Sequence, residues 1–208
     1  MNRPLPRKFF SRPTVQVARE LLGKVLVHAT GDGTTSGMVV EDEAYLGEYD
    51  PGSHAARGIT PRNSVMFGTP GLSYVYFTYG MHYCFNAVAK PEGKAGAVLI
   101  RALEPLKGEE LMQKRRGRDD RLSLTSGPAK LAQALAIGRE QNSVDLTSGD
   151  LYFTDGTRND FSIGNSCRIG LSKGRELPLR FYIEGNPYVS RKTGNSINRR
   201  QNNKTKDD

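Results

Sequence analysis

Apolar and polar residues alternate along much of the chain, in short runs that glycine and proline interrupt. This period of two is typical of β-strands that bury one face. Two of the runs flank the turn sequence GDGTT and predict a hairpin, and further runs follow in the middle of the chain and near its end. The expected strands are residues 25–29, 36–45, 72–80, 83–90, 96–105, 150–154, 166–172 and 177–185.

Other segments carry apolar residues at helical spacing instead. The first helix is expected to run from Thr14, which can cap it, to Gly23, which can end it. A basic helix is expected at residues 107–117, and another between Ser126 as cap and Gly138 as its end. Because the chain shows no repeat and no internal linker, these helices and strands predict a single α+β domain.

This domain is expected to span residues 1–190. Residues 46–71 interrupt the pattern as a long loop, and loops of this length are usually functional or disordered. Residues 191–208 are polar and poor in apolar side chains, so a basic, disordered tail is expected there.

The charge balance favours a polyanionic partner. The 208 residues include 30 Lys and Arg against 22 Asp and Glu, which gives a formal net charge of +8. Six positive and two negative groups fall in residues 191–208, so the tail carries +4 and the rest of the chain carries the other +4. A basic surface attracts nucleic acid or acidic lipid.

Several other classes of protein find little support. The two cysteines, Cys84 and Cys167, suit neither a disulfide scaffold nor a zinc site. The N-terminal residues lack the apolar segment of a signal peptide, and no apolar run approaches the roughly 20 residues of a membrane span. We therefore expect a soluble, cytoplasmic protein that binds neither a metal nor a membrane.

Three carboxylates close the second strand of the hairpin, in the sequence VVEDEAY. Because strand side chains alternate, Glu41, Glu43 and Tyr45 share one face. One interpretation is an edge strand with solvated acids. The other is a carboxylate that acts on a substrate, which the long loop after the strand favours. Arg101 is the odd charged residue of the run VLIRAL, and Glu43 is its natural partner.

The aromatic strands suggest contact with nucleic-acid bases. Tyr74 and Tyr76 share one strand face, where their rings can stack on bases or pack inside the sheet. The following turn places Tyr79 and Met81 at a hairpin tip, and exposed apolar tips can insert between base steps. Asn86 lies on the next strand, where a buried amide must be hydrogen-bonded.

These segments occur together, in the same order, in a known family. The chain resembles the alkyladenine (3-methyladenine) DNA glycosylases in the runs VEDEAYLG, TPRN, YVYFTYGMHYCFN, GAVLIRALEP, SGPAKLAQALAI and LPLRFYIEGNPYVS. Each run alone is a weak signal, but the ordered set, from about Ala18 to Ser190, is highly specific. The resemblance implies a curved, mostly antiparallel sheet with flanking helices and a protruding β-hairpin that inserts into DNA.

The resemblance also implies a function, that of a monofunctional base-excision repair enzyme. Such an enzyme flips alkylated or deaminated purines (the 3-methyladenine, hypoxanthine and ethenoadenine class) out of duplex DNA and hydrolyses their glycosidic bonds. The implied catalytic residues are Glu43, which activates water, and Arg101, which positions it. The residues implied for the base pocket are Tyr45, His54, Tyr76 and Asn86. Those implied for intercalation and the minor groove are Tyr79, Met81 and His82.

The chain departs from the family pattern around the pocket. His82 and Tyr83 stand where other members have different aromatic residues, and the loop HAARGITPRN is one residue shorter. The resemblance implies no cofactor, and a monomer acting on duplex DNA is expected. Two alternatives stay open: a sugar-active glycosidase that pairs Glu41 with Glu43, and a non-catalytic nucleic-acid-binding module. A lyase activity would need an amine, which Lys130 could supply.

Overall fold

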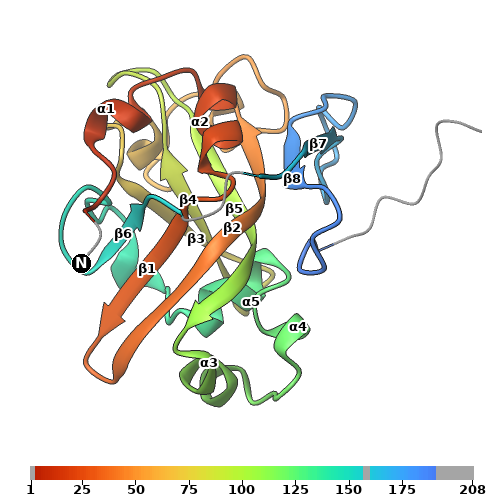
Figure 1. Cartoon of the computed structure of the whole chain (residues 1–208). Coiled ribbons are helices and arrows are strands. Elements are labelled where there is room, and N and C mark those ends of the chain that lie inside the picture. The colour runs from red at the N-terminus through yellow and green to blue at the C-terminus, as the bar shows by residue number, and fades with distance from the viewer. Residues whose placement is uncertain (1–2, 157–159, 191–208) are drawn as a thin grey trace, which may run out of the picture.

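One antiparallel sheet organises the molecule (Figure 1). The computed structural model of the chain describes residues 3–156 and 160–190. Six strands follow one another in the order β3-β4-β5-β2-β1-β6, while β8 pairs with both β2 and β7. Each of these pairings is antiparallel. The strands are β1 (Val25–Thr30), β2 (Gly33–Tyr45), β3 (Ser73–Thr78), β4 (His82–Val88), β5 (Ala97–Lys107), β6 (Leu151–Thr154), β7 (Ile163–Ser166) and β8 (Arg180–Ile183).

The long strand β2 lies in the interior of this sheet. It pairs with β5 along one edge, and with β1 and then β8 along the other. Its register with β5 shifts on both sides of Glu41, which marks a local bulge. The edge-strand interpretation is therefore wrong, because paired strands flank Glu41, Asp42 and Glu43 on both sides. Their side chains are not solvated either, since all three residues have no exposed surface.

Short helices cover the sheet. The helix α2 packs against β2 and β5, and α5 packs against β4, β5 and α3. In Figure 1, α1 and α2 lie at one end of the view and α3, α4 and α5 at the other. The α-helices are α1 (Arg7–Phe10), α2 (Thr14–Leu21), α3 (Glu109–Arg116), α4 (Arg121–Leu124) and α5 (Pro128–Ala134), and the 3₁₀ helices are η1 (His54–Arg57), η2 (Ser64–Phe67) and η3 (Arg139–Gln141).

The single α+β domain and its antiparallel sheet are confirmed, but the expected ends of two helices are wrong. Thr14 is the first residue of α2 and makes no capping hydrogen bond. Gly127 takes the position before α5 that was expected for Ser126. The helix ends before Gly138, because Ala136 adopts a positive φ of 53° and the chain leaves the helix there.

The strand expected at residues 166–172 is also wrong beyond its first residue. The strand β7 ends at Ser166, and Arg168 turns inward to form a buried ion pair with Asp50. The long loop at residues 46–71 has structure of its own, since it contains η1 and η2. Both segments therefore help to build the site described below.

The hairpin of β3 and β4 ends in an exposed apolar tip. The side chains of Tyr79 and Met81 are exposed, at 83% and 70% of their full surface. Both Tyr79 and Gly80 have positive φ, and the Met81 N–H donates to the Thr78 carbonyl over 3.3 Å. A left-handed tyrosine costs about 1–3 kcal/mol and usually persists where a function needs it. The predicted tip is thus present, while its insertion into DNA stays a prediction.

Within the described residues, no helix is both long and apolar enough to cross a membrane. The basic tail expected at residues 191–208 lies outside the part of the chain that the structure describes.

Candidate active site

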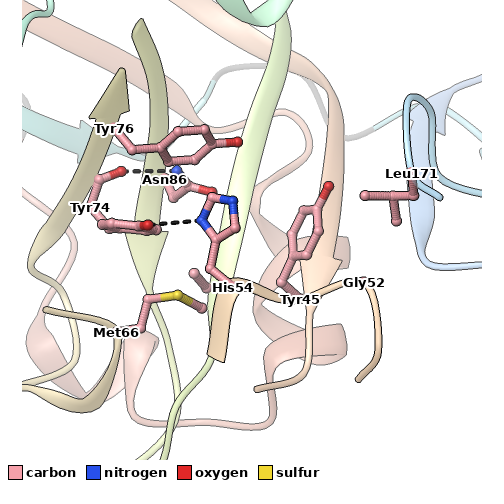
Figure 2. Close-up of a pocket in the computed structure, with 9 residues that line it drawn as sticks. Tyr45, Gly52, His54, Met66, Tyr74, Tyr76, Asn86 and Leu171 are labelled. Atoms are coloured by element: carbon pink, nitrogen blue, oxygen red, sulfur yellow. Dashed lines mark hydrogen bonds between the residues drawn. The ribbon is translucent and has the colours of Figure 1, made fainter. Parts of the chain in front are cut away.

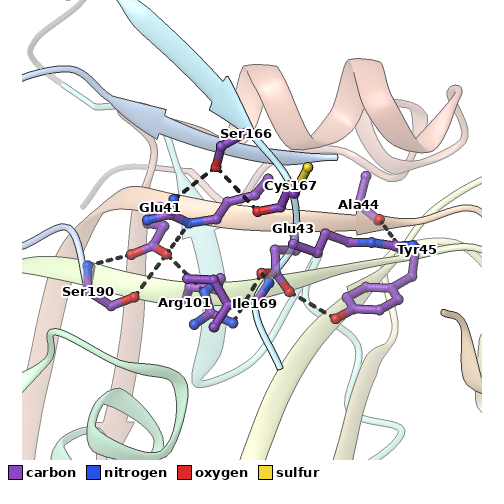
Figure 3. Close-up of polar contacts among 11 residues, drawn as sticks. Glu41, Glu43, Ala44, Tyr45, Arg101, Ser166, Cys167, Ile169 and Ser190 are labelled. Atoms are coloured by element: carbon purple, nitrogen blue, oxygen red, sulfur yellow. Dashed lines mark hydrogen bonds and ion pairs between the residues drawn. The ribbon is translucent and has the colours of Figure 1, made fainter. Parts of the chain in front are cut away.

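Glu43, near the end of β2, has donors around both of its carboxylate oxygens (Figure 3). The Tyr45 hydroxyl donates to Oε2 over 2.8 Å, and the Ile169 backbone N–H donates to Oε1 over 2.8 Å. Arg101 Nη1 lies 3.2 Å from Oε1. Burial, and then the charge of Glu43, raise the pKa of Tyr45 far above its ordinary value, so the phenol keeps its proton for this bond.

Glu41 holds Arg101 in place. Arg101 Nε donates to Glu41 Oε1 over 2.9 Å, and Arg180 Nε donates to the same oxygen over 2.7 Å. The backbone N–H of Ser190 donates to Oε2 over 2.6 Å (Figure 3). Burial alone would raise the pKa of Glu41, but the two arginines hold it below its ordinary value. Arg101 therefore contacts both acids. Arg180 and Ser190 bind Glu41, whereas Glu43 is joined through Tyr45 to the pocket described next, so Glu41 is poorly placed to act as the second carboxylate of a glycosidase.

Aromatic side chains line a pocket next to Glu43 (Figure 2). Its empty volume, open solvent included, is about 340 Å³. The end of β2 supplies Tyr45, one face of β3 supplies Tyr74 and Tyr76, and β4 supplies Asn86. The first residue of η1, His54, completes the polar lining. The four residues implied for a base pocket therefore come together in one cavity.

Hydrogen bonds fix the two polar residues of this pocket. His54 Nδ1 lies 2.8 Å from the Tyr74 hydroxyl, and the His54 ring packs edge-on against Tyr76 with 4.6 Å between centroids. Burial, and then the charge of Arg62, lower the pKa of His54. Asn86 Nδ2 donates to the Tyr74 carbonyl over 2.9 Å, so the amide joins β3 to β4 and also faces the pocket.

Comparison with known proteins identifies the family. The family model for methylpurine-DNA glycosylases (MPG) matches residues 8–187 of the chain. The chain belongs to the methylpurine-DNA glycosylase family. It is accordingly a DNA N-glycosylase.

Relatives from other organisms agree with this assignment. A protein of Prosthecochloris aestuarii is 52% identical over 191 residues, covering 89% of this chain and 90% of its own length. Proteins of Carboxydothermus hydrogenoformans and Methanoculleus marisnigri are each 50% identical over 192 residues, covering 90% of this chain and 99% of their own. All three carry 3-methyladenine DNA glycosylase in their names.

The glycosylase also contains a buried ion pair that the sequence analysis missed. Arg168 donates to both carboxylate oxygens of Asp50, over 2.5 and 2.6 Å, and neither side chain is exposed. The guanidinium carbon lies 4.6 Å from the centre of the Tyr45 ring. A Cβ at Gly52 would come within 2.7 Å of Arg168 Nη2, so only glycine allows the loop to approach so closely. The signal was Arg168 itself, an arginine in the apolar run CRIGL.

The remaining candidate residues of the glycosylase lie outside this pocket. Tyr79 and Met81 are at the hairpin tip, and the exposed His82 begins β4. The Lys130 ammonium lies 3.5 Å from the hydroxyl of Ser126, which precedes α5. Within the described chain, Lys130 does not line the aromatic pocket and makes no hydrogen bond or ion pair with Glu43.

Proposed function

We propose that this glycosylase flips alkylated or deaminated purines out of duplex DNA and excises them by attack of water at C1′. The substrates would be purines of the 3-methyladenine, hypoxanthine and ethenoadenine class. The observation that carries the proposal is the position of Tyr45, whose hydroxyl holds Glu43 and whose ring lines the aromatic pocket. The names of the relatives support 3-methyladenine as one substrate.

Glu43 acts in this proposal as the general base. Breaking a glycosidic bond places positive charge on the sugar, and a carboxylate both stabilises that charge and takes a proton from water. General-base catalysis of this kind contributes roughly 10²–10⁴-fold to the rate. Because Glu41 fixes Nε of Arg101, Nη1 stays beside Glu43, where it can orient the attacking water.

The flipped base stacks against Tyr45 and Tyr76, while the His54 ring, which meets Tyr76 edge-on, faces the edge of the base. Tyrosine faces attract cations, so the pocket suits 3-methyladenine, which is cationic while attached to the sugar. Such a base leaves without acid catalysis, whereas neutral hypoxanthine needs a proton on the purine. Asn86 faces the pocket from β4 and can exclude the 2-amino group of guanine.

The hairpin tip and the charge of the chain support binding to duplex DNA. Tyr79, with Met81 and His82 beside it, fills the gap that the flipped nucleotide leaves, and flipping costs a few kcal/mol. The net charge of +8 supplies affinity for phosphates that depends on salt. A monomer suffices, because one chain provides all of these residues, and the enzyme acts on DNA in the cytoplasm.

Product analysis tests this proposal. Duplexes that contain 3-methyladenine, hypoxanthine or ethenoadenine are incubated with the enzyme, and released bases and strand breaks are measured, with an undamaged duplex as control. Free base and an alkali-sensitive site without a strand break are the expected products. A break that forms without alkali would contradict the monofunctional assignment. Binding of the lesion duplexes without release of any base would favour a non-catalytic binding module.

A further inference from the structure

The hydrogen bond between His54 and Tyr74 determines what the pocket offers to its ligand. His54 Nδ1 and the Tyr74 hydroxyl oxygen are 2.8 Å apart (Figure 2). A neutral imidazole carries one proton. If Nδ1 accepts from the hydroxyl, Nε2 carries the proton and is a donor, and if Nδ1 donates, Nε2 is an acceptor. The direction of this one bond therefore decides the character of the second ring nitrogen.

The relative acidities of the two groups favour donation by the phenol. A tyrosine hydroxyl, with a reference pKa of about 10, is a far stronger acid than the N–H of a neutral imidazole. An imidazole nitrogen, whose conjugate acid has a reference pKa of about 6.5, is a far better base than a phenol oxygen. The hydrogen bond therefore runs from the Tyr74 hydroxyl, as donor, to His54 Nδ1, as acceptor.

Burial of Tyr74 supports the same direction. This side chain is 1% exposed, and among the described residues its hydroxyl has no other acceptor than His54 Nδ1. If Nδ1 donated instead, the phenol proton would be buried without a partner, which proteins avoid.

The charge of Arg62 leaves this direction unchanged. The Arg62 guanidinium lies along β3, where Nη2 donates to the Phe77 carbonyl over 3.1 Å. Burial raises the pKa of Tyr74 to about 12, and the charge of Arg62 opposes that rise. The phenol is therefore still a far stronger acid than the N–H of a neutral imidazole.

The His54 ring is also neutral. Burial lowers its pKa, and Arg62 lowers it further. The groups that face the ring are Tyr74 and Tyr76 from β3 and Tyr45 from the end of β2, which stay uncharged because burial raises the pKa of each phenol. The imidazole therefore offers the pocket a hydrogen bond without a positive charge.

We propose that Tyr74 locks His54 in the Nε2–H tautomer, so that this position of the pocket is always a hydrogen-bond donor. Figure 2 shows the second ring nitrogen turned toward the space between Tyr76 and Tyr45. If the proposed function holds and a flipped purine fills that space, the lock favours a base with a carbonyl or bare ring nitrogen at this edge. A base with an exocyclic amino group at this edge, 3-methyladenine included, gains no hydrogen bond from the locked ring.

Nitrogen NMR of the uniformly ¹⁵N-labelled chain tests the lock without any substrate. The chain has three histidines, and His28 is an internal reference of the opposite kind. His28 Nδ1 lies 2.6 Å from the Leu135 carbonyl oxygen, which can only accept, so His28 must carry its proton on Nδ1. We expect His54 to show the pure Nε2–H pattern at about pH 8 and to become charged at a lower pH than a free histidine, because burial and the charge of Arg62 lower its pKa. A pattern like that of His28, or nitrogen shifts averaged between the two tautomers, would overturn the proposal.

Tyr74→Phe tests the part assigned to the hydroxyl, with Tyr152→Phe on β6 as matched control. In Tyr74→Phe, the nitrogen shifts of His54 should move toward averaged values. The rate of hypoxanthine excision relative to that of 3-methyladenine, which has an amino group in place of the 6-oxygen, should fall by up to about tenfold, because the unlocked ring can also accept from that amino group. Unchanged shifts, or equal loss on both bases, would overturn the role of Tyr74. The spectrum does not depend on catalysis, so failure of the proposed function would leave it unaltered.

Discussion

At the scale of single residues, the three adjacent acids of β2 have very different surroundings. Arginines and other donors contact Glu41 and Glu43. Asp42 alternates with Val40 and Ala44, which belong to the apolar core, and within the described chain neither of its oxygens has a hydrogen-bond partner. Burial, and then the charges of Glu41 and Glu43, raise the pKa of Asp42 well above its ordinary value. This acid is therefore a pH-dependent weakness of the fold.

Asp42→Asn should remove that weakness, because asparagine keeps the size of aspartate but does not ionise. An acid whose pKa is raised by folding stabilises the native state fully below its unfolded pKa, near 3.8, and loses this contribution as pH rises toward the folded pKa. The loss approaches about 1.4 kcal/mol per pH unit in that window. Urea unfolding at about pH 5 and about pH 8 should show the variant gaining stability over wild type at the higher pH. A difference that does not change with pH would contradict this account.

At the scale of elements, local patterns predicted most of the fold. The period of two predicted the hairpins and the aromatic strands, and the glycines near residues 107 and 117 predicted the two ends of α3. These features could be predicted because they depend on neighbours in sequence. The loops after β2 and β7 could not be predicted in the same way. They are fixed by Arg168 and Asp50, which are 118 positions apart. The contact of Arg101 with Glu41 could not be predicted for the same reason. Arg180, from the distant strand β8, donates to the same Glu41 oxygen.

The Arg168–Asp50 pair should therefore contribute to both stability and catalysis. Removing one member of a buried pair leaves an uncompensated charge, so Asp50→Asn should cost about 3–5 kcal/mol of unfolding free energy. It should also slow excision, because the guanidinium against Tyr45 loses its anchor. Asp155→Asn is the matched control, since the ion pair of Asp155 with Lys24 is exposed and should be worth less than about 1 kcal/mol. Equal losses in the two variants, measured by urea unfolding, would refute this role.

At the scale of the whole molecule, one hairpin serves both the pocket and the outer surface. The strand β3 contributes Tyr76 to the pocket wall, and the turn that follows it carries the exposed Tyr79. The hairpin of β3 and β4 would then hold both a base in the pocket and the Tyr79 side chain in the duplex. In our proposal this couples base flipping to filling of the gap.

Tyr79→Ala should slow excision from duplex DNA more than excision from single strands, because only a duplex leaves a gap to fill. Leu122→Ala is the control, since Leu122 is an exposed apolar residue on α4. Excision rates on a hypoxanthine lesion in both contexts provide the comparison. The wedge interpretation fails if Tyr79→Ala lowers the two rates by the same factor.

The central claim is that Glu43 performs the chemistry, and single-turnover excision by Glu43→Gln tests it most directly. Glutamine keeps the size, and its oxygen can accept the Ile169 bond while its NH2 group donates to the Tyr45 hydroxyl, but it cannot take a proton from water. Glu184→Gln, at an exposed position after β8, is the control. The account predicts that Glu43→Gln binds the lesion duplex as wild type does and excises the base roughly 10²–10⁴-fold more slowly. Excision by Glu43→Gln at a rate close to that of wild type and of Glu184→Gln would contradict it.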